Sequence, residues 1–475
     1  MDELIQSART LRETFQKDPY RPAYHFVIPE GNAMPFDPNG AIFWKGKYHL
    51  FYIYQDKELG HCWGHASSVD TLHWRSHPVG LASMPGDPDK GIFSGCALLD
   101  KNGVPTLVYF GIDAGICIAQ CEEDDLINWV KSPHNPVIPM AKEGSPEAEL
   151  YCVFDPHCWL EGDTYYAGLG NLHKGDDNGD TLFLFKSKDL INWEYLHPMY
   201  QSDRKWTELD DDCACPDFFK LGNTHMLLFI SHRRCAQYYL GRWENETFYP
   251  ERHGLMNKLD GGPLFAPESL QDDKGRRIFW GWIFDTMDQK ELGWSGVMSM
   301  PRILSLADDG TLKIQPVPEL ERQRVRPRTC ENLTVTGESA LENIQGDCLE
   351  LSLEIAPSDA AEYGVKVRCS PDGQEQTVIT YNPSAKTLCV DATNCHREGD
   401  YLHTLPLELA PGEPLKLRIF LDKSVVEVFA NDRQCITARV YPKREDSTGI
   451  SLFSKGDSIT VKTLNAWDIA PTNSW

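Results

Sequence analysis

DPNGAIFWKGKYHLFYIYQ, residues 37–55, sets out a pattern that recurs along the chain. A polar start leads into a short apolar strand, a tight polar turn and an aromatic-rich strand that returns. Two such strands joined by a short turn predict a β-hairpin. The same order of features begins again at Ser94, Asp155, Cys215 and Ala266. The copies lie roughly 50 to 60 residues apart, which is the spacing of a four-stranded propeller blade.

Five copies of this unit predict a five-bladed β-propeller, and alternating strands after residue 328 predict an antiparallel sandwich. We therefore expect an all-β fold in which the propeller is followed by a C-terminal β-sandwich. A run of hairpins in one large sandwich is the alternative, and the even spacing argues against it. The first strand of each propeller blade lines the central channel. The polar residues that open the repeats, such as Asp37 and Asp155, should therefore meet at one mouth of that channel.

The chain divides into four predicted regions. An amphipathic helix is expected near the N-terminus, because Leu4, Ala8, Leu11 and Phe15 follow helical spacing. Prolines bound a short connecting helix in PVPELERQRVRP, residues 316–327. The predicted regions are a helical lead over 1–22, the propeller over 23–313, a linker over 314–327 and the sandwich over 328–475.

The charge and cysteine content of the chain indicate which kinds of binding partner and cellular compartment to expect. A net charge of −24 and a pI near 5.0 disfavour binding to nucleic acid or to anionic membranes. The first residues lack the basic start and apolar stretch of a secretory signal, and the 15 cysteines read as reduced thiols. We therefore expect a cytoplasmic protein whose partner is a small-molecule or oligosaccharide substrate, with a homo-oligomer left open.

Several segments carry a resemblance to one enzyme family. They include MPFDPNGAIFWKGKYHLFY around Asp37, VFDPHCW around Asp155, CPDFF from Cys215, FAPESL from Phe265 and, in the sandwich, LRIFLDKSVVEVFANDRQCITARVYP. Together they resemble glycoside hydrolase family 32, the invertase and fructan hydrolase family. The resemblance implies a retaining glycosidase that cleaves a fructofuranoside or a related furanoside. It also implies that Asp37 is the nucleophile and that Asp155 steadies the transition state.

The sequence departs from the family pattern at four positions of the implied site. Ala214 stands where the family has its acid/base Glu, and Phe36 replaces the Asn before the nucleophile. Ile53 replaces a Gln, and Phe154 replaces the Arg beside Asp155. A divergent subgroup with a reshaped sugar site is the interpretation we favour. An introduced alanine would also explain position 214, but it would leave the other three replacements unexplained.

The missing acid needs a replacement, and the segment WTELDDDCACPDFF offers spare carboxylates. Side chains two apart in a strand share a face, so Asp212 should point the same way as Ala214. We predict Asp212 as the acid, with Glu208 and Glu268 as rivals and Asp217 as an orienting residue. The alternative for residues 210–212 is a solvated loop face.

The remaining expectations concern the sugar and its surroundings. No metal or cofactor is required by the mechanism, and none is expected. A glycosyl transferase of the same fold and a non-catalytic sugar-binding propeller are the alternative functions, and the sandwich is expected to support the propeller rather than bind carbohydrate. The predicted substrate contacts are Phe36, Asn39, Ile53, Phe93, Ser94, Phe154, Glu268 and Trp282.

Overall fold

The computed structural model describes residues 2–28, 35–172, 179–257, 262–284, 294, 296–395 and 401–473. Its described residues separate into two compact units. The first unit runs from Ile28 to Leu306, and the second combines the residues up to Val27 with those from Ala307 onward. The division into four regions, with changes after residues 22, 313 and 327, stays a prediction. None of the helices in the described ranges has the length and apolar character of a membrane span.

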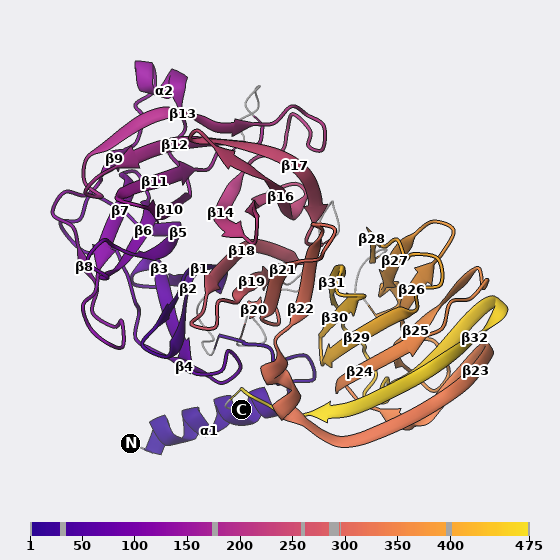
Figure 1. The fold of residues 1–475 in the computed structure, drawn as a ribbon. Helices are drawn as coiled ribbons and strands as arrows, with labels where there is room; N and C mark the ends of the chain where they lie inside the picture. Colours follow the sequence, from indigo (N-terminus) through magenta and orange to yellow (C-terminus); the bar gives the residue numbers. More distant parts are fainter. Residues whose placement is uncertain are drawn as a thin grey trace. The chain divides into compact units, whose positions relative to one another are not determined.

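The first unit is a five-bladed β-propeller, which confirms the prediction from the repeats (Figure 1). Blade 1 contains β1 (Pro35–Trp44), β2 (Lys47–Asp56), β3 (Gly60–Ser68) and β4 (Trp74–Ser76). Blade 2 contains β5 (Ile92–Leu99), β6 (Pro105–Gly111), β7 (Gly115–Gln120) and β8 (Val130–Lys131), with β9 (Ile138–Pro139) beside β7. Blade 3 contains β10 (Pro156–Glu161), β11 (Thr164–Leu169), β12 (Thr181–Ser187) and β13 (Trp193–Gln201), and the short helix α2 (Pro146–Leu150) precedes it.

The last two blades repeat the same meander. Blade 4 contains β14 (Ala214–Leu221), β15 (Thr224–Ser231), β16 (Cys235–Glu244) and β17 (Thr247–Leu255). Blade 5 contains β18 (Leu264–Gln271), β19 (Arg277–Ile283) and β21 (Arg302–Leu306), with β20 (Val297–Met298) beside β19, and β22 (Leu312–Pro316) comes last in the order of that sheet.

The inner strands of the five blades form a closed ring. Each of β1, β5, β10, β14 and β18 contacts the next, and β18 returns to β1. Near its start, the inner strand of every blade except the third has a bulge in its pairing with the neighbouring strand. Gly40, Cys215 and Ala266 have left-handed backbone at three of these bulges. Bulges re-aim side chains, so the inner strands start with side chains redirected at one mouth of the channel.

The second unit is a β-sandwich, as predicted, and it is built from one folded sheet. Its elements are α1 (Asp2–Lys17), the 3₁₀ helices η2 (Pro318–Gln323) and η3 (Thr393–Cys395), and the strands β23 (Arg324–Gln345), β24 (Cys348–Ile355), β25 (Glu362–Cys369), β26 (Thr377–Asn382), β27 (Thr387–Asp391), β28 (Leu402–Pro406), β29 (Leu415–Asp422), β30 (Val425–Ala430), β31 (Gln434–Arg439) and β32 (Gly449–Ile469). The sheet order is β28-β27-β26-β25-β32-β24-β29-β30-β31, and β23 pairs with β32.

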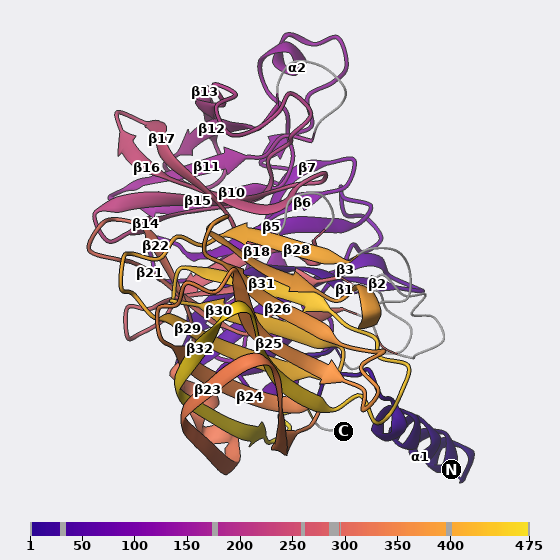
Figure 2. The ribbon, with the colours of Figure 1, turned by 90° about the vertical axis from the view of Figure 1, so that its right-hand side faces the viewer.

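The two long strands β23 and β32 belong to both layers of this sandwich (Figures 1 and 2). The first part of β32 pairs with β25 and its last part pairs with β24. Between these parts the pairing with β23 shifts, and Gly337 and Gly456 both have positive φ there. Glycine reaches this backbone region without the Cβ clash that other residues meet. Two glycines therefore let one pair of strands pass from one layer to the other.

The start of the chain is tied to this second unit by one carboxylate. Asp422, at the end of β29, accepts the backbone N–H groups of Ala23, Tyr24 and His25 at 2.6, 2.9 and 2.7 Å. It also contacts Nδ1 of His25 at 2.9 Å. The Asp422 side chain is fully buried, so these bonds replace the water that a carboxylate would otherwise need.

Candidate active site

Two of the predicted catalytic carboxylates meet at one cysteine. The Sγ of Cys215, in β14, lies 3.6 Å from Oδ2 of Asp37 and 3.6 Å from Oδ2 of Asp155. The backbone N–H of Cys215 also donates to Oδ2 of Asp155 at 3.0 Å, and Ser94 Oγ donates to Oδ2 of Asp37 at 3.1 Å. The starts of four inner strands thus bring Asp37, Ser94, Asp155 and Cys215 together at one mouth of the channel.

Burial changes the proton affinity of both carboxylates. Asp155 is only 3% exposed, and burial, together with the nearby charge of Asp37, raises its pKa to about 7. Burial also raises the pKa of Asp37, while the hydrogen bonds from Ser94 and Cys215 act in the opposite direction. The donors at Asp37 favour its charged form, whereas the charge of Asp37 disfavours ionisation of Asp155. This division suits Asp37 to act as an ionised nucleophile.

The side chain of Asn39 is hydrogen-bonded to backbone groups on both sides and does not face the open channel. Its Nδ2 donates to the carbonyl of Asp37 at 2.8 Å, and its Oδ1 accepts the N–H of Gly95 at 3.0 Å. The side chain is buried, and both ends of its amide are used. Asn39 therefore joins β1 to β5 beside Asp37, which makes it a positioning residue and corrects our expectation that it contacts substrate.

Apolar rings line one side of the mouth. The ring of Phe154 packs on Phe110 at 5.4 Å, and Phe93 lies 6.3 Å from Phe110. Ile53 is buried in the neighbouring apolar cluster with Trp63. The polar groups that the family resemblance implied at positions 53 and 154 are thus replaced by packed apolar side chains. The side chain of Phe36 lies outside the described part of the structure.

A second aromatic group stands on blade 5. The ring of Trp282 lies 6.1 Å from Phe265 and 5.5 Å from Phe284, and the Trp282 side chain is partly exposed. Phe265 is near the start of β18, so this group borders the same mouth as Asp37. Flat rings of this kind pack against the apolar faces of sugars. The role of Trp282 as a substrate contact stays a prediction.

The acidic run at residues 210–212 is paired rather than solvated. Its partners are three consecutive basic residues that follow β15. Asp210 is paired with Arg233 and, at 3.3 Å, with Arg234, and Asp211 lies 2.8 Å from Arg234. These ion pairs show that residues 210–212 are neither a solvated loop face nor a set of spare carboxylates, so both of these interpretations were wrong.

Both carboxylate oxygens of Asp212 are hydrogen-bonded to one residue, His232. The ring Nδ1 of His232 lies 2.5 Å from Oδ2 of Asp212, and the backbone N–H of His232 donates to Oδ1 at 2.7 Å. Asp212 is 2% exposed, whereas the His232 side chain is 49% exposed. Sequence reasoning overlooked His232. The available signal was its position in the sequence. His232 directly follows the apolar strand HMLLFIS, which pairs with the strand that begins at Ala214.

Glu268 points to a different part of the channel. Its Oε1 accepts the N–H of Ala41 at 2.7 Å, and it lines a cavity of about 680 Å³ together with residues from the far ends of the inner strands, such as Phe43 and Gln271. Burial, followed by the charge of Asp217, raises the pKa of Glu268 well above its usual range. Glu268 is therefore removed from the Asp37 mouth, which corrects its prediction as a substrate contact and as a rival acid. Glu208 is exposed.

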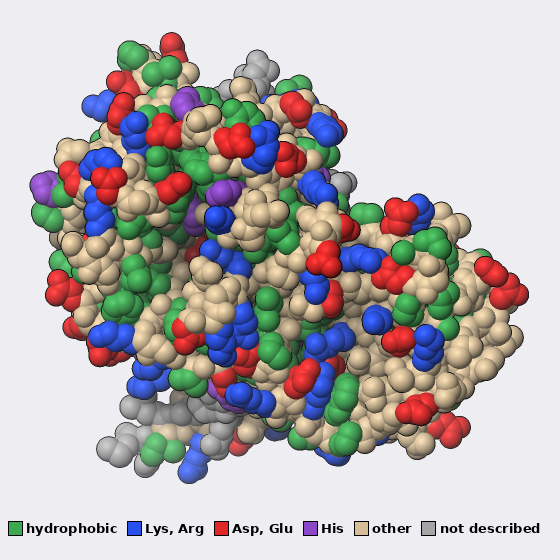
Figure 3. Space-filling view, viewed as in Figure 1, with side chains coloured by type: hydrophobic (Ala, Val, Ile, Leu, Met, Phe, Trp, Pro, Cys, Tyr) green, Lys and Arg blue, Asp and Glu red, His purple; other side chains and the backbone are tan. Residues whose placement is uncertain are grey.

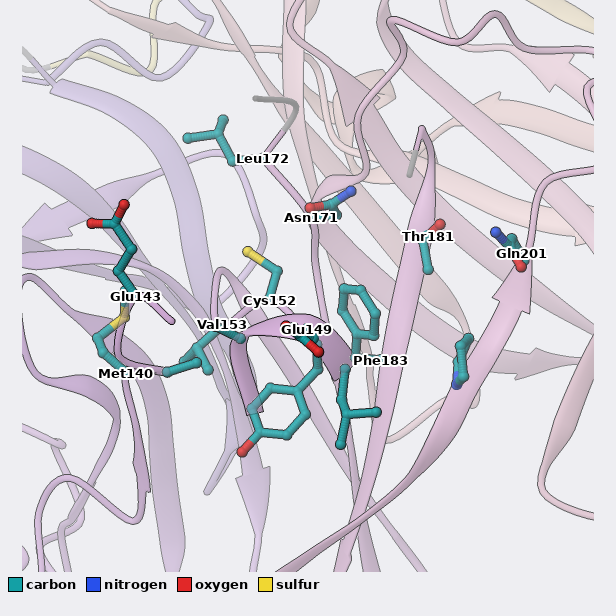
Figure 4. A pocket seen from close by; sticks show the side chains of 15 residues that line it. Met140, Glu143, Glu149, Cys152, Val153, Asn171, Leu172, Thr181, Phe183 and Gln201 are labelled. Atoms are coloured by element: carbon teal, nitrogen blue, oxygen red, sulfur yellow. The ribbon is translucent and has the colours of Figure 1, made fainter. Parts of the chain in front are cut away.

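Another cavity, of about 530 Å³, lies beside blade 3 (Figure 4). Tyr151, Cys152, Asn171 and Phe183 are among its lining residues, and Glu149 of α2 also lines it. The lining contains neither Asp37 nor Asp155. The cavity therefore neighbours the segment that carries Asp155 without including the carboxylate.

Charged side chains of both signs are mixed across the face of the molecule in Figure 3. The net charge of −24 therefore does not gather into one acidic patch on that face. Within the described residues, no group of three or more His, Cys, Asp or Glu side chains is arranged to hold a metal ion.

Two family models match the chain, one after the other along the sequence. The family model described as Glycosyl hydrolases family 32 N-terminal domain matches residues 25–316, and the model described as Glycosyl hydrolases family 32 C terminal matches residues 319–468. The chain belongs to glycosyl hydrolases family 32. It is accordingly a glycosidase, an enzyme that hydrolyses O-glycosyl bonds.

Individual relatives of this family 32 chain match over nearly its whole length. It is 31% identical to the sucrose-6-phosphate hydrolase of Escherichia coli, with 95% of each chain covered. It is 30% identical to the raffinose invertase of Escherichia coli, with 96% of this chain and 97% of that one covered. The crystal structure of fructan 1-exohydrolase IIa from Cichorium intybus has a TM-score of 0.83 at 23% identity, covering 96% and 98% of the two chains.

Proposed function

We propose that this family 32 enzyme cleaves a fructofuranoside, or a related furanoside, with retention of configuration. Asp37 attacks the anomeric carbon to form a covalent glycosyl-enzyme, and Asp155 stabilises the positive charge of the transition state. The observation that carries this proposal is the meeting of Asp37 and Asp155 on Cys215 at one mouth of the propeller. Ser94 supports it, because its hydroxyl holds the Asp37 oxygen in place.

The names of the relatives support the substrate class. They include a sucrose-6-phosphate hydrolase, a raffinose invertase and a levanase. One solved structure of similar fold is a variant of fructan 1-exohydrolase IIa from Cichorium intybus in complex with 1-kestose. The apolar side chains of Ile53 and Phe154 replace hydrogen-bonding groups of the family, so the sugar that fits here presents a more apolar edge or a different hydroxyl pattern.

The environment of the thiols supports a cytoplasmic location. The fifteen cysteines are thiols that take part in no disulfide, and a reducing compartment keeps thiols in that state. Thiol titration of protein prepared without reductant should count fifteen reactive groups after unfolding. A homo-oligomer stays a prediction, which light scattering on a sizing column tests directly.

The function is tested by replacing the nucleophile. Asp37→Ala should abolish turnover of fructosides while leaving the circular dichroism spectrum and melting temperature near those of the wild type, because Asp37 is a partly exposed channel residue. Asp163→Ala, at the exposed tip of a hairpin in blade 3, is the matched control and should keep full activity. An Asp37→Ala enzyme that works at the wild-type rate would show that the nucleophile is elsewhere.

Retention is tested separately, by NMR of the reaction mixture. The anomer that forms first should have the configuration of the substrate, because two displacements at one carbon restore it. The inverted anomer as first product would overturn the covalent mechanism.

A further inference from the structure

The pairing of β14 with β15 places His232 beside the position of the missing acid. Ala214, the first residue of β14, pairs with Ile230, and Asp212 and His232 lie just beyond the paired ends of β14 and β15. The two side chains are hydrogen-bonded to each other there, two residues along the chain from Ala214 and from its partner Ile230.

The His232 ring is held with one nitrogen inward and the other outward. Nδ1 contacts the buried Asp212 at 2.5 Å, and the ring edge packs on Phe265 at 5.7 Å. Among the described residues, Nε2 has no hydrogen-bond partner, and the side chain is half-exposed. The charge of His232 acts on both Asp37 and Asp155. A proton donor aimed at the sugar site would have this arrangement: a carboxylate behind it and an open nitrogen in front.

We propose that His232 is the catalytic acid and base of this enzyme, and that Asp212 is its positioning residue. The proposal rests on the proposed retaining hydrolysis by Asp37, and it replaces the expectation that Asp212 itself donates the proton. Both oxygens of Asp212 are occupied by His232, so the carboxylate reaches the reaction only through the ring.

The surrounding charges favour the protonated form of the His232 ring. The hydrogen bond that His232 donates to Asp212 raises the pKa of His232, and the charges of Asp212, Asp155 and Asp37 act in the same direction, against burial. Arg233 and Arg234 follow His232 in the chain, but their charges are offset by Asp210 and Asp211. An imidazolium ion can therefore be present near neutral pH, where a general acid is needed.

The two chemical steps balance with these groups. In the first, an Asp37 oxygen bonds to the anomeric carbon while the glycosidic C–O bond breaks, and the leaving oxygen takes both the bonding electrons and the proton from His232 Nε2. The alcohol departs, leaving a glycosyl ester on Asp37 and a neutral imidazole. In the second, Nε2 takes a proton from water as the water oxygen attacks the anomeric carbon, and the ester bond electrons return to Asp37. The sum is hydrolysis, with both groups restored.

The test compares leaving groups. The probes are methyl β-D-fructofuranoside, whose leaving oxygen needs a proton, and 4-nitrophenyl β-D-fructofuranoside, whose leaving group does not. His232→Ala should lower kcat/KM for the methyl glycoside by roughly 10²- to 10⁴-fold and that for the aryl glycoside by less than about tenfold. Equal losses on both probes, or no loss on either, would overturn the assignment.

A matched control comes from a second Asp–His pair in blade 1. Nδ1 of His73 lies 2.8 Å from Asp70, and the His73 side chain is 49% exposed, as His232 is. His73→Ala should change neither rate. Asp37→Ala should remove activity on both probes, and an active Asp37→Ala enzyme would overturn the proposed function itself. A wild-type protein that cleaves neither probe would overturn both proposals. If only the assignment of His232 is wrong, Asp37→Ala will be inactive while His232→Ala keeps full activity.

The role of Asp212 has its own readout. The basic limb of the pH profile of kcat/KM should report the His232 proton and should be lost in His232→Ala. Asp212→Asn should move this limb to lower pH, because the carboxylate that raises the pKa of His232 is gone. A purely structural role for Asp212 would lower the rate without moving the limb, and that result would overturn its assignment.

Discussion

The backbone N–H of Cys215 donates to Oδ2 of Asp155 at 3.0 Å, and this carboxylate is almost completely buried. Burial outweighs this bond and raises the pKa of Asp155 to about 7. A raised pKa means that the folded protein resists ionisation of this group. Its contribution to stability is therefore greatest at low pH and is lost as the pH rises from about 4 to about 7.

Asp155→Asn should remove this pH dependence. Relative to the wild type, the variant should gain on the order of 2 kcal/mol of unfolding free energy between pH 5 and pH 8. Melting temperatures over this range provide the measurement. Asp163→Asn is the control, since its exposed carboxylate has a lowered pKa and stays charged throughout. A constant difference between wild type and Asp155→Asn would show that Asp155 ionises normally.

Sucrose should be a poor substrate. The apolar side chains of Ile53 and Phe154 occupy positions where the family has hydrogen-bonding groups, and each sugar hydroxyl left unpaired costs about 1 to 3 kcal/mol. Steady-state kinetics on sucrose and on a panel of other fructosides measure this preference. A kcat/KM for sucrose of roughly 10⁴ M⁻¹s⁻¹ or above, typical of an efficient enzyme, would contradict the prediction.

Removal of Asp422 should loosen the N-terminal segment. Asp422→Ala leaves the buried N–H groups of Ala23, Tyr24 and His25 without their acceptor, at a cost of about 3 kcal/mol or more. Hydrogen exchange should rise at residues 23–25, and the melting temperature should fall. Asp432→Ala should have a smaller effect, because among the described side chains the Asp432 carboxylate accepts a hydrogen bond only from Gln315. Equal exchange in both variants would refute the prediction.

Gly337 should resist replacement for a backbone reason. Its φ of 71° is disfavoured for residues with a Cβ, although nothing lies within 4 Å of the space that a Cβ would fill. Gly337→Ala should therefore cost roughly 1 to 2 kcal/mol. Gly168→Ala is the control, because its backbone is ordinary and an added Cβ would meet only normal contacts. Denaturation midpoints compare the two, and a harmless Gly337→Ala would show that β23 does not need this bend.

Much of the propeller could be predicted because its signals are local. A hairpin such as residues 37–55 is specified by its own turn and by strands that follow directly in the chain. Five such units in order determine which residues open the inner strands. Asp37, Ser94 and Asp155 could therefore be expected at one mouth before any coordinates were known, and the structure brings them together.

The partners of the acidic run depended on the fold. Residues 210–212 look like three spare carboxylates in the sequence, but each is claimed by one of residues 232–234 across a hairpin. The side chains of Asn39 and Glu268 accept hydrogen bonds from backbone N–H groups of neighbouring strands. Their burial could therefore not be predicted from the sequence. Neither the composition nor the order of motifs specifies the distances between these side chains and their partners.

The sequence by itself determined the family, the all-β class, the number of blades and the identity of the two facing carboxylates. These follow from turn residues, strand periodicity and motifs, which act over a few neighbouring positions. Tertiary structure alone decided that Asp212 belongs to His232, that Glu268 faces the other end of the channel, and that the sandwich is one sheet bent at Gly337 and Gly456. The physical reason is that hydrogen-bond partners and burial depend on strand register, which joins residues far apart in the chain.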